Sequence, residues 1–253
     1  MKIATWNING IRAREAQVIE WLSTEHPDIV CLQELKAASE QVPASLLHLP
    51  DYQSFWHGER AYSGVALLLH RRLISETPIF EHPDFDFETR MVTARIGNII
   101  YASVYAPNGG KDFAAKMHFF QALERYVIDL KATGQDLILC GDMNITRGDI
   151  DVHPKERKDG VIGQRPEERA LFERVLVGGG LVDTGRALAP DNDSMFTWWP
   201  PWRGMRQKNI GWRLDYVLAS DQLARRVTQC VVRTQTGTSD HAPVVAEMME
   251  NIV

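Results

Sequence analysis

The sequence has no long apolar run and no linker. Every apolar stretch is short and carries polar residues at its ends, whereas a membrane-spanning helix needs about 20 apolar residues in succession. The first residues, from Met1 to Asn7, become polar too early to form the apolar core of a secretory signal. No repeat or low-complexity tract interrupts the chain. We therefore expect a cytoplasmic protein that binds no membrane.

Cysteine is scarce, and basic residues are not in excess. Cys31, Cys140 and Cys230 lie far apart inside apolar runs and form no CxxC pair, which predicts buried free thiols and argues against a zinc or redox role. Lysine and arginine number 28 against 33 acidic residues, a net charge of −5. This balance argues against a protein held on nucleic acid by bulk charge alone. It allows an enzyme that grips phosphates with a local patch and a metal ion.

Short strand-like and longer helix-like segments alternate along the 253 residues. Runs of Val, Ile, Leu and Tyr that end at Gly, Pro, Asn or Asp predict buried strands at Ile3–Trp6, Ile29–Leu32, Val65–Leu69, Met91–Ile96, Ile99–Tyr105, Leu137–Cys140, Leu214–Leu218 and Val244–Met248. Apolar residues at helical spacing predict helices over Arg14–Ser23, Asp112–Leu130 and from Pro166 onward. We expect one α/β domain over residues 1–253, with two packed sheets and helices outside.

Polar side chains follow most of these strands at the point where each strand ends. Because strand ends in an α/β sheet converge on one edge, where ligands bind, we expect these side chains to lie together. They form an oxygen-rich set without a thiol: Asn7, Asn9, Glu34, Tyr105, Asn108, Asp142, Asn144, Asp215, Asp240 and His241. Carboxylate and amide oxygens suit Mg²⁺ or Mn²⁺ better than zinc. The residues therefore favour metal-assisted hydrolysis of a phosphate ester.

Each of these motifs has an ordinary structural explanation when it is taken alone. Gly141-Asp142-Met143-Asn144 is a common turn, and Ser239-Asp240-His241 before a proline is a common capped loop. Most tryptophans lie in a core or an interface, and Trp198, Trp199 and Trp212 fit such a role. These explanations are less convincing for the motifs as a set, because all of the motifs fall at strand ends of one chain.

Six motifs in order resemble the exonuclease III family of apurinic/apyrimidinic endonucleases, within the endonuclease/exonuclease/phosphatase superfamily. They are Trp6-Asn7-Ile8-Asn9-Gly10, Leu32-Gln33-Glu34-Leu35-Lys36, Tyr105-Ala106-Pro107-Asn108, Gly141-Asp142-Met143-Asn144, Gly211-Trp212-Arg213-Leu214-Asp215-Tyr216 and Ser239-Asp240-His241-Ala242-Pro243. The similarity extends from Lys2 to about Glu247. It implies a four-layered α/β sandwich, two mixed sheets flanked by helices, and a Mg²⁺-dependent DNA-repair nuclease, with Mn²⁺ as the alternative ion.

The resemblance also implies a role for each polar residue at the strand ends. Glu34 resembles the principal metal ligand, with Asn9 and Asp240 near the ion, and Asn7 would hold Glu34 or a metal-bound water. Asp142 matches the residue that deprotonates the attacking water, and Asn144 its neighbour that donates to the phosphate. His241, polarised by Asp215, would contact a phosphate oxygen. Tyr105 would stabilise charge on the phosphoryl group, and Asn108 would add a phosphate contact.

The implied substrate is duplex DNA with abasic sites or 3′ ends, acted on by a monomer. Trp198, Trp212 and Leu214 match the positions that wall a pocket for the bare sugar, which leaves the base stack more readily than a paired nucleotide. Lys36, Arg90, Lys111 and the loops Pro154–Gly163 and Pro200–Gly211 would contact phosphates without reading sequence. We expect cleavage 5′ of abasic sites and trimming of 3′ ends.

Two departures and two alternatives remain open at this point. The loop Asp151–Arg165 lacks the asparagine-rich, aromatic-ended form of many relatives, and Asn9 stands where some carry Asp, which should weaken metal affinity modestly. A superfamily phosphoesterase acting on an inositol phosphate or a phospholipid headgroup is the alternative enzyme. A catalytically silent DNA-binding module is the alternative of another class, and the filled catalytic positions argue against it.

Overall fold

Twelve strands form two six-stranded sheets in the structure, a computed structural model that describes residues 1–59, 62–74 and 76–249. The first sheet has the order β11-β12-β1-β2-β4-β3, with bounds Val227–Val232, Val244–Met248, Lys2–Asn7, Ile29–Gln33, Val65–His70 and Tyr52–His57. The second has the order β5-β6-β7-β8-β10-β9, with bounds Ile79–Glu81, Met91–Ile96, Ile99–Tyr105, Asp136–Asp142, Asp215–Ser220 and Leu181–Asp183.

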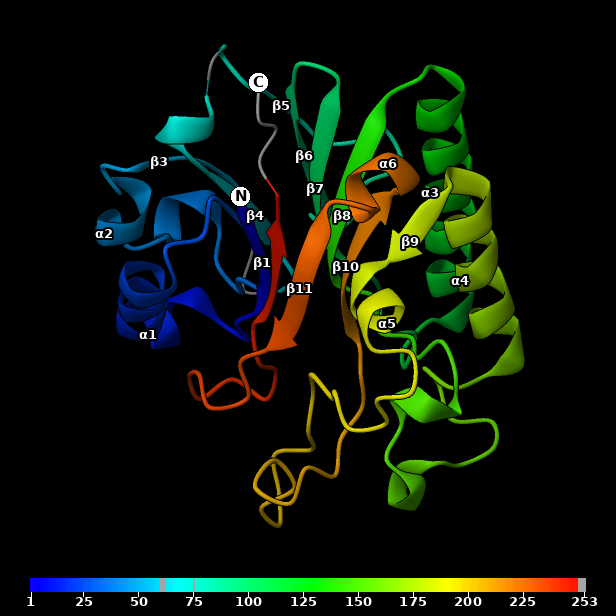
Figure 1. Cartoon of the computed structure of the whole chain (residues 1–253). Helices are drawn as coiled ribbons and strands as arrows, with labels where there is room; N and C mark the ends of the chain where they lie inside the picture. The colour runs from blue at the N-terminus through cyan, green and yellow to red at the C-terminus, as the bar shows by residue number, and fades with distance from the viewer. Residues whose placement is uncertain (60–61, 75, 250–253) are drawn as a thin grey trace.

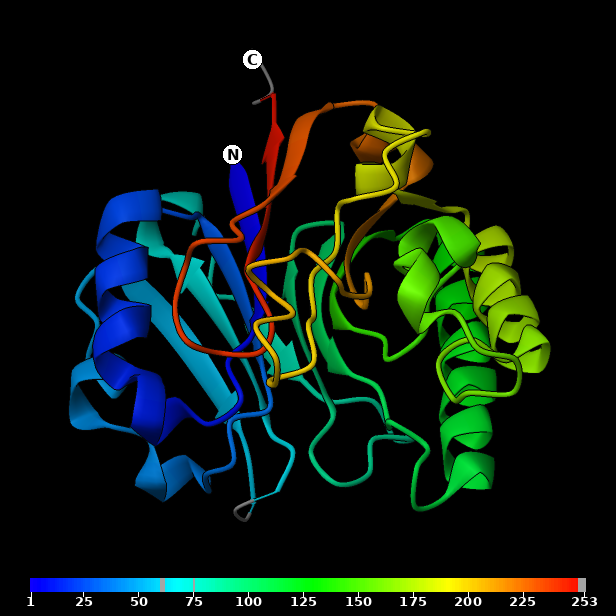
Figure 2. The ribbon, with the colours of Figure 1, turned by 90° about the horizontal axis from the view of Figure 1, so that it is seen from below.

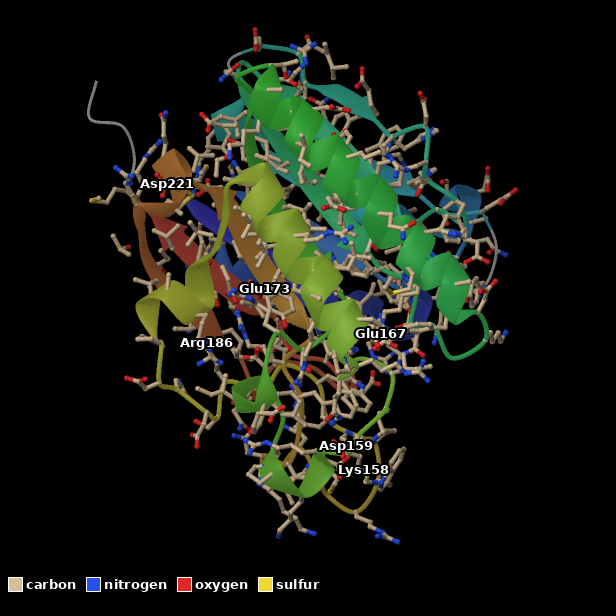
Figure 3. The ribbon with its side chains drawn as sticks, turned by 90° about the vertical axis from the view of Figure 1, so that its right-hand side faces the viewer. Lys158, Asp159, Glu167, Glu173, Arg186 and Asp221 are labelled. Carbon is tan, nitrogen blue, oxygen red and sulfur yellow. The ribbon has the colours of Figure 1, made fainter. Side chains whose placement is uncertain are left out.

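The sheets face each other and helices cover their outer faces (Figure 1). Helix α1 (Ile11–Glu25) packs on the first sheet through Val18, Trp21 and Leu22. Helices α3 (Phe113–Ala132) and α4 (Pro166–Gly179) pack side by side on the second (Figure 3). The shorter helices are α2 (Ala44–Leu47), α5 (Thr184–Leu188) and α6 (Asp221–Ala224). The expected four-layered α/β sandwich is confirmed.

The inner faces of the two sheets make the central apolar layer of the core. Ile3, Ile29 and Leu67 of the first sheet pack there with Val92 and Ile138 of the second, all at most 1% exposed. Burying one such side chain contributes about 1.5–3 kcal/mol relative to leaving it in water. Since both faces of each central strand are covered, the strands have the continuous apolar sequence that predicted them.

Strand directions place the site at one edge of the sandwich. The parallel pairs β1–β2 and β7–β8 stand in the middle of the two sheets and end at the same edge. The antiparallel strands β10 and β12 begin at that edge, because Asp215 pairs with Asp142 and Val244 pairs with Thr5. Long connections, including the loop before β10, hang below this edge in Figure 1 and face the viewer in Figure 2. We call it the carboxyl edge.

Several sequence predictions need correction. The strands β3, β5, β9 and β11 and the short helices were not expected. Helix α1 begins at Ile11, three residues earlier than expected, and β10 begins at Asp215 instead of Leu214. Cys31 and Cys140 are buried free thiols as expected, but Cys230 lies on the edge strand β11 and is only half-buried. Among the described residues, no helix is long and apolar enough to cross a membrane.

Candidate active site

A histidine lies between two aspartates at the centre of the carboxyl edge. Nδ1 of His241 is 2.8 Å from Oδ2 of Asp215, and its Nε2 is 3.8 Å from Oδ2 of Asp142. The three side chains come from the loop before β12 and from the paired ends of β10 and β8. All three residues are at most 5% exposed, so their charges interact with little screening by water.

Burial and charge set the proton affinities of this trio. Burial raises the pKa of Asp142 to about 7, although His241 opposes the shift. Burial alone would lower the pKa of His241, but the negative charges of Asp215 and Asp142 outweigh it and raise the pKa to about 10. At neutral pH the imidazole is therefore a cation, and Asp142 is poised to gain or lose a proton.

Two asparagines hold Asp142, and a third continues the hydrogen-bonded chain to an exposed position. Asn7 Nδ2 donates to Asp142 Oδ2 at 2.9 Å, and the backbone N–H of Asn144 donates to Oδ1 at 2.9 Å. Asn144 Nδ2 donates to the Ala106 carbonyl, and Asn108 Nδ2 donates to Asn144 Oδ1 at 3.2 Å. Asn7 thus contacts Asp142, whereas the sequence analysis expected it to hold Glu34 or a metal-bound water.

A second cluster of oxygens surrounds the ammonium group of Lys36. Lys36 Nζ lies 2.9 Å from Glu34 Oε1 and donates to Asn9 Oδ1 at 2.6 Å. Asn9 Nδ2 donates to Asp240 Oδ1 at 2.8 Å, and the Asn9 backbone N–H donates to Asn7 Oδ1. One hydrogen-bonded network thus joins Glu34 and Asp240 to Asp142, so the residues expected to hold a metal and to activate water share one site.

Several residues of this network have left-handed backbone conformations. The φ angles of Asn9, Glu34, Lys36 and Asn144 lie between 47° and 56°. Asparagine adopts this region more readily than other residues, whereas Glu34 and Lys36 pay a strain of about 1–3 kcal/mol each. Backbone hydrogen bonds hold the strained turn, since the Glu34 carbonyl accepts from Gly10 and the Lys36 N–H donates to Ser63. Such strain is typical of functional sites.

Tyr105 and Arg90 form one wall of the site. The Arg90 guanidinium lies 5.2 Å from the centre of the Tyr105 ring and also contacts the rings of Tyr62 and Phe87. Burial and then the charges of Glu34 and Asp142 raise the pKa of Tyr105, so the phenol stays protonated and can donate a hydrogen bond. Arg90 is 3% exposed and paired with Glu88 at 2.6 Å, so it supports Tyr105 instead of reaching a phosphate as expected.

Trp198 lies beside both His241 and Trp212, and Leu214 is two residues further along the chain from Trp212. The two indole rings meet edge to face with centroids 5.6 Å apart, and Trp198 Nε1 donates to Asp240 Oδ2 at 2.9 Å. Leu214 is 6% exposed. The indole N–H of Trp212 is buried and has no hydrogen-bond partner among the described residues. An unpaired buried donor costs about 1–3 kcal/mol, which is explained if a ligand supplies the acceptor.

The sequence analysis did not identify Lys116 and Glu168 as functional residues. Both are fully buried, and their side chains form an ion pair. Lys116 Nζ also donates to the backbone carbonyls of Asn108 (3.2 Å) and Asn144 (2.9 Å), so it ties two loops of the site to helix α4. A lysine on the buried face of a predicted amphipathic helix is the signal that could have revealed it.

The oxygens around Lys36 fit a divalent cation. The protein already places a positive charge between Glu34 and Asn9, and Asp240 is one hydrogen bond away. Lys36 is 41% exposed at its side chain and can move aside. Asp142, Asp215 and His241 form a second group whose ligand atoms lie within 4.8 Å of one another. Since the imidazole of that group is cationic at neutral pH, the oxygen cluster at Glu34 is the better metal site.

The fold and the site together define the class of protein. Two packed sheets that carry carboxylates, amides and one buried histidine at a common edge are the features of a metal-dependent phosphoesterase. The chain belongs to the endonuclease/exonuclease/phosphatase family, whose model matches residues 4–241. Within that family it is an enzyme of the nuclease type, a hydrolase.

Several named relatives align with nearly the whole chain. An exodeoxyribonuclease of Bacillus subtilis is 34% identical over 263 residues, covering all of both chains. The DNA repair nuclease APEX1 of Danio rerio is 33% identical, covering 96% of this chain and 81% of its own. Recombination repair protein 1 of Drosophila melanogaster is 34% identical, but the chain covers only 36% of its length. The solved 3′ phosphatase NExo from Neisseria, bound to a product DNA hairpin, superimposes with a TM-score of 0.89 at 31% identity, covering 99% of this chain and 100% of that one.

Proposed function

We propose that this chain is a Mg²⁺-dependent DNA-repair nuclease that cleaves duplex DNA 5′ of abasic sites and removes nucleotides or blocking groups from 3′ ends. The observation that carries the proposal is the continuous network from Glu34 through Lys36, Asn9 and Asn7 to Asp142, with His241 3.8 Å from Asp142. The names of the relatives given above indicate that they act in DNA repair or on DNA ends, which supports DNA as the substrate of this chain. We propose a single catalytic domain that works as a monomer.

Asp142 is the proposed base for the attacking water. It is buried, its pKa is raised to about 7, and both its oxygens already accept hydrogen bonds from Asn7 and Asn144. These donors fix the direction of the carboxylate, so a water molecule held by it is aimed at one point. A base whose pKa is close to the working pH transfers protons efficiently.

Three groups are proposed to stabilise the phosphate. His241 is a cation because Asp215 and Asp142 face it, and its Nε2 points into the site. Tyr105 keeps its proton and can donate, and Asn144 holds its amide beside Asp142. Donors fixed before the reaction stabilise the charge that develops on the phosphoryl oxygens without reorganising.

Glu34, Asn9 and Asp240 would hold the divalent ion, with Lys36 displaced. When bound, Mg²⁺ supplies positive charge that polarises a phosphoryl oxygen and offsets the repulsion between the acidic site and its substrate. The all-oxygen donor set suits Mg²⁺ or Mn²⁺ better than zinc.

We propose that Trp198, Trp212 and Leu214 form the wall against which a bare deoxyribose packs. The unpaired indole N–H of Trp212 would find its acceptor there. Lys111, whose ammonium lies 5.6 Å from the Tyr62 ring at the same edge, is proposed to contact the DNA backbone.

The test supplies the purified protein with three substrates: an abasic-site duplex, an intact duplex with a recessed 3′ end, and an inositol phosphate. Each is incubated with Mg²⁺ and with a chelator, and Asp142→Asn serves as the control for a contaminating nuclease. We expect incision of the first and trimming of the second, both abolished by the chelator and lowered by several orders of magnitude in the variant. Hydrolysis of the inositol phosphate alone would contradict the proposal and favour the phosphoesterase alternative.

A further inference from the structure

His57, His82 and Asp86 form a cluster outside the proposed active site. His57 is the last residue of β3, and the other two lie in the connection between β5 and β6. One nitrogen or oxygen atom from each lies within 4.8 Å of those from the other two. The strands β3 and β5 are the outermost strands of different sheets, so the cluster joins the two sheets where no strand pairing does.

Two imidazoles and one carboxylate are a ligand set of distinct chemistry. They differ from the oxygen cluster around Glu34, because imidazole nitrogen prefers Zn²⁺ and related transition ions to Mg²⁺. A Zn²⁺ ion with three protein ligands keeps a fourth position for water. These residues lie outside the hydrogen-bonded network that joins Glu34 to Asp142.

The three ligand atoms lie within 4.8 Å of one another, somewhat further apart than around a bound ion. His57 Nε2 lies 2.6 Å from Asp86 Oδ2, and the His57 and His82 rings stack with centroids 4.7 Å apart. Ligand atoms about 2.0–2.2 Å from a tetrahedral Zn²⁺ must lie within roughly 3.5 Å of one another. His82 is exposed, so its ring is free to rotate from the stack toward the ion.

The carboxylate is held as a metal ligand usually is. Asp86 Oδ1 accepts the backbone N–H groups of Arg90 (2.8 Å) and Met91 (2.9 Å), which leaves Oδ2 directed at His57. Hydrogen bonds of this kind orient metal ligands and tune their affinity. The stacked rings of Phe55 and Phe80 lie between the same two strands and shield one side of the cluster.

We propose that His57, His82 and Asp86 bind one Zn²⁺-type ion that fastens the edge of the first sheet to the connection preceding β6. The ion would also rigidify the wall of the active site, since Asp86 anchors the backbone of Arg90 and the Arg90 guanidinium lies against Tyr105. The site takes a transition-metal ion and does not take part in catalysis.

In the experiment, Zn²⁺ is titrated into the full chain in the presence of excess Mg²⁺. Binding is measured by calorimetry, and the effect of Zn²⁺ on stability is measured by thermal unfolding. His82→Ala removes one ligand, and His118→Ala, which removes an exposed histidine of helix α3, is the matched control. Zn²⁺ taken up at the catalytic site is common to all three proteins and cancels in the comparison. Asp86→Asn provides a second variant of the cluster.

We expect the wild type and His118→Ala to bind one more equivalent of Zn²⁺ than His82→Ala, or to bind it at least ~10-fold more tightly. A loss of this size is typical when a contact that supports a metal ion is removed. Zn²⁺ should raise the melting temperature of the first two proteins more than that of His82→Ala and Asp86→Asn, because a ligand that binds only the native state stabilises it. Identical isotherms for wild type and His82→Ala would show that His82 holds no ion and that His57 and Asp86 form only a hydrogen-bonded pair. Neither measurement depends on nuclease activity.

Discussion

Replacing Lys116 with methionine removes a charge from the interior directly behind the proposed phosphate-binding loops. Lys116 and Glu168 are both 0% exposed and form an ion pair, and Glu168 Oε1 also accepts the Gly163 N–H. Methionine fills most of the volume of lysine, so the main cost is a buried carboxylate without its cation. Breaking one partner of such a pair costs about 3–5 kcal/mol, a large fraction of the roughly 5–15 kcal/mol that stabilises a typical domain.

The same substitution should slow the reaction. Lys116 Nζ holds the carbonyls of Asn108 and Asn144, and the Asn144 side chain lies beside Asp142. A shift of about 1 Å in a positioned group can cost roughly 100-fold in rate, so we expect kcat to fall by at least ~10-fold with a smaller change in KM.

The assay is urea unfolding together with steady-state kinetics on a 3′-recessed duplex. Lys131→Met, an exposed lysine near the end of the same helix, is the matched control and should cost well under ~1 kcal/mol. Adding Glu168→Gln to Lys116→Met should restore at least about half of the lost stability, because the unpaired charge is then gone. If Lys116→Met were as stable and as active as Lys131→Met, the bridging role would be refuted.

Four further predictions concern the edge of the sheets. Glu34→Gln should raise the Mg²⁺ concentration needed for half-maximal rate at least ~10-fold, and an unchanged titration would remove Glu34 from the metal site. Lys36→Met should lower that concentration, since the ammonium competes for the same oxygens, and a higher requirement would contradict this. Trp212→Ala should reduce abasic incision more than 3′ trimming, whereas equal losses would remove Trp212 from the pocket. Activity should increase with pH as Asp142 loses its proton near its pKa of about 7, and saturating Mg²⁺ should move that limb of the pH–rate profile to lower pH; a profile flat from pH 5 to 8 at low Mg²⁺ would argue against Asp142 as the base.

The strands that carry the site could be predicted because both their faces are buried. β1, β2, β7 and β8 are continuous apolar runs that stop at polar residues, and this pattern located the carboxyl edge. The edge strands β3 and β11 contain adjacent polar residues, Gln53-Ser54 and Thr228-Gln229, and β5 and β9 have only three residues each. Short or half-exposed strands lack the apolar signal on which the prediction relied.

The contacts inside the site were less predictable than its composition. Local sequence gives no reason for Glu34 and Lys36 to adopt left-handed conformations, which depend on bonds to Gly10 and Ser63 from other parts of the chain. The burial of Arg90 follows from three aromatic rings that come together only in the folded chain. Motif order could locate the functional residues, but their partners depend on the packing of two sheets.

The charges at the carboxyl edge explain how an acidic protein can act on a polyanion. Four carboxylates meet there, those of Glu34, Asp142, Asp215 and Asp240, and two cations face them, His241 and Lys36. With all four carboxylates ionised, the site has an excess of two negative charges. Burial together with this excess raises the pKa of Asp142. A divalent ion that displaces the Lys36 ammonium would lower this excess from two negative charges to one. The same ion that admits the phosphate would therefore also release the proton from Asp142, so substrate binding and base activation depend on a single event.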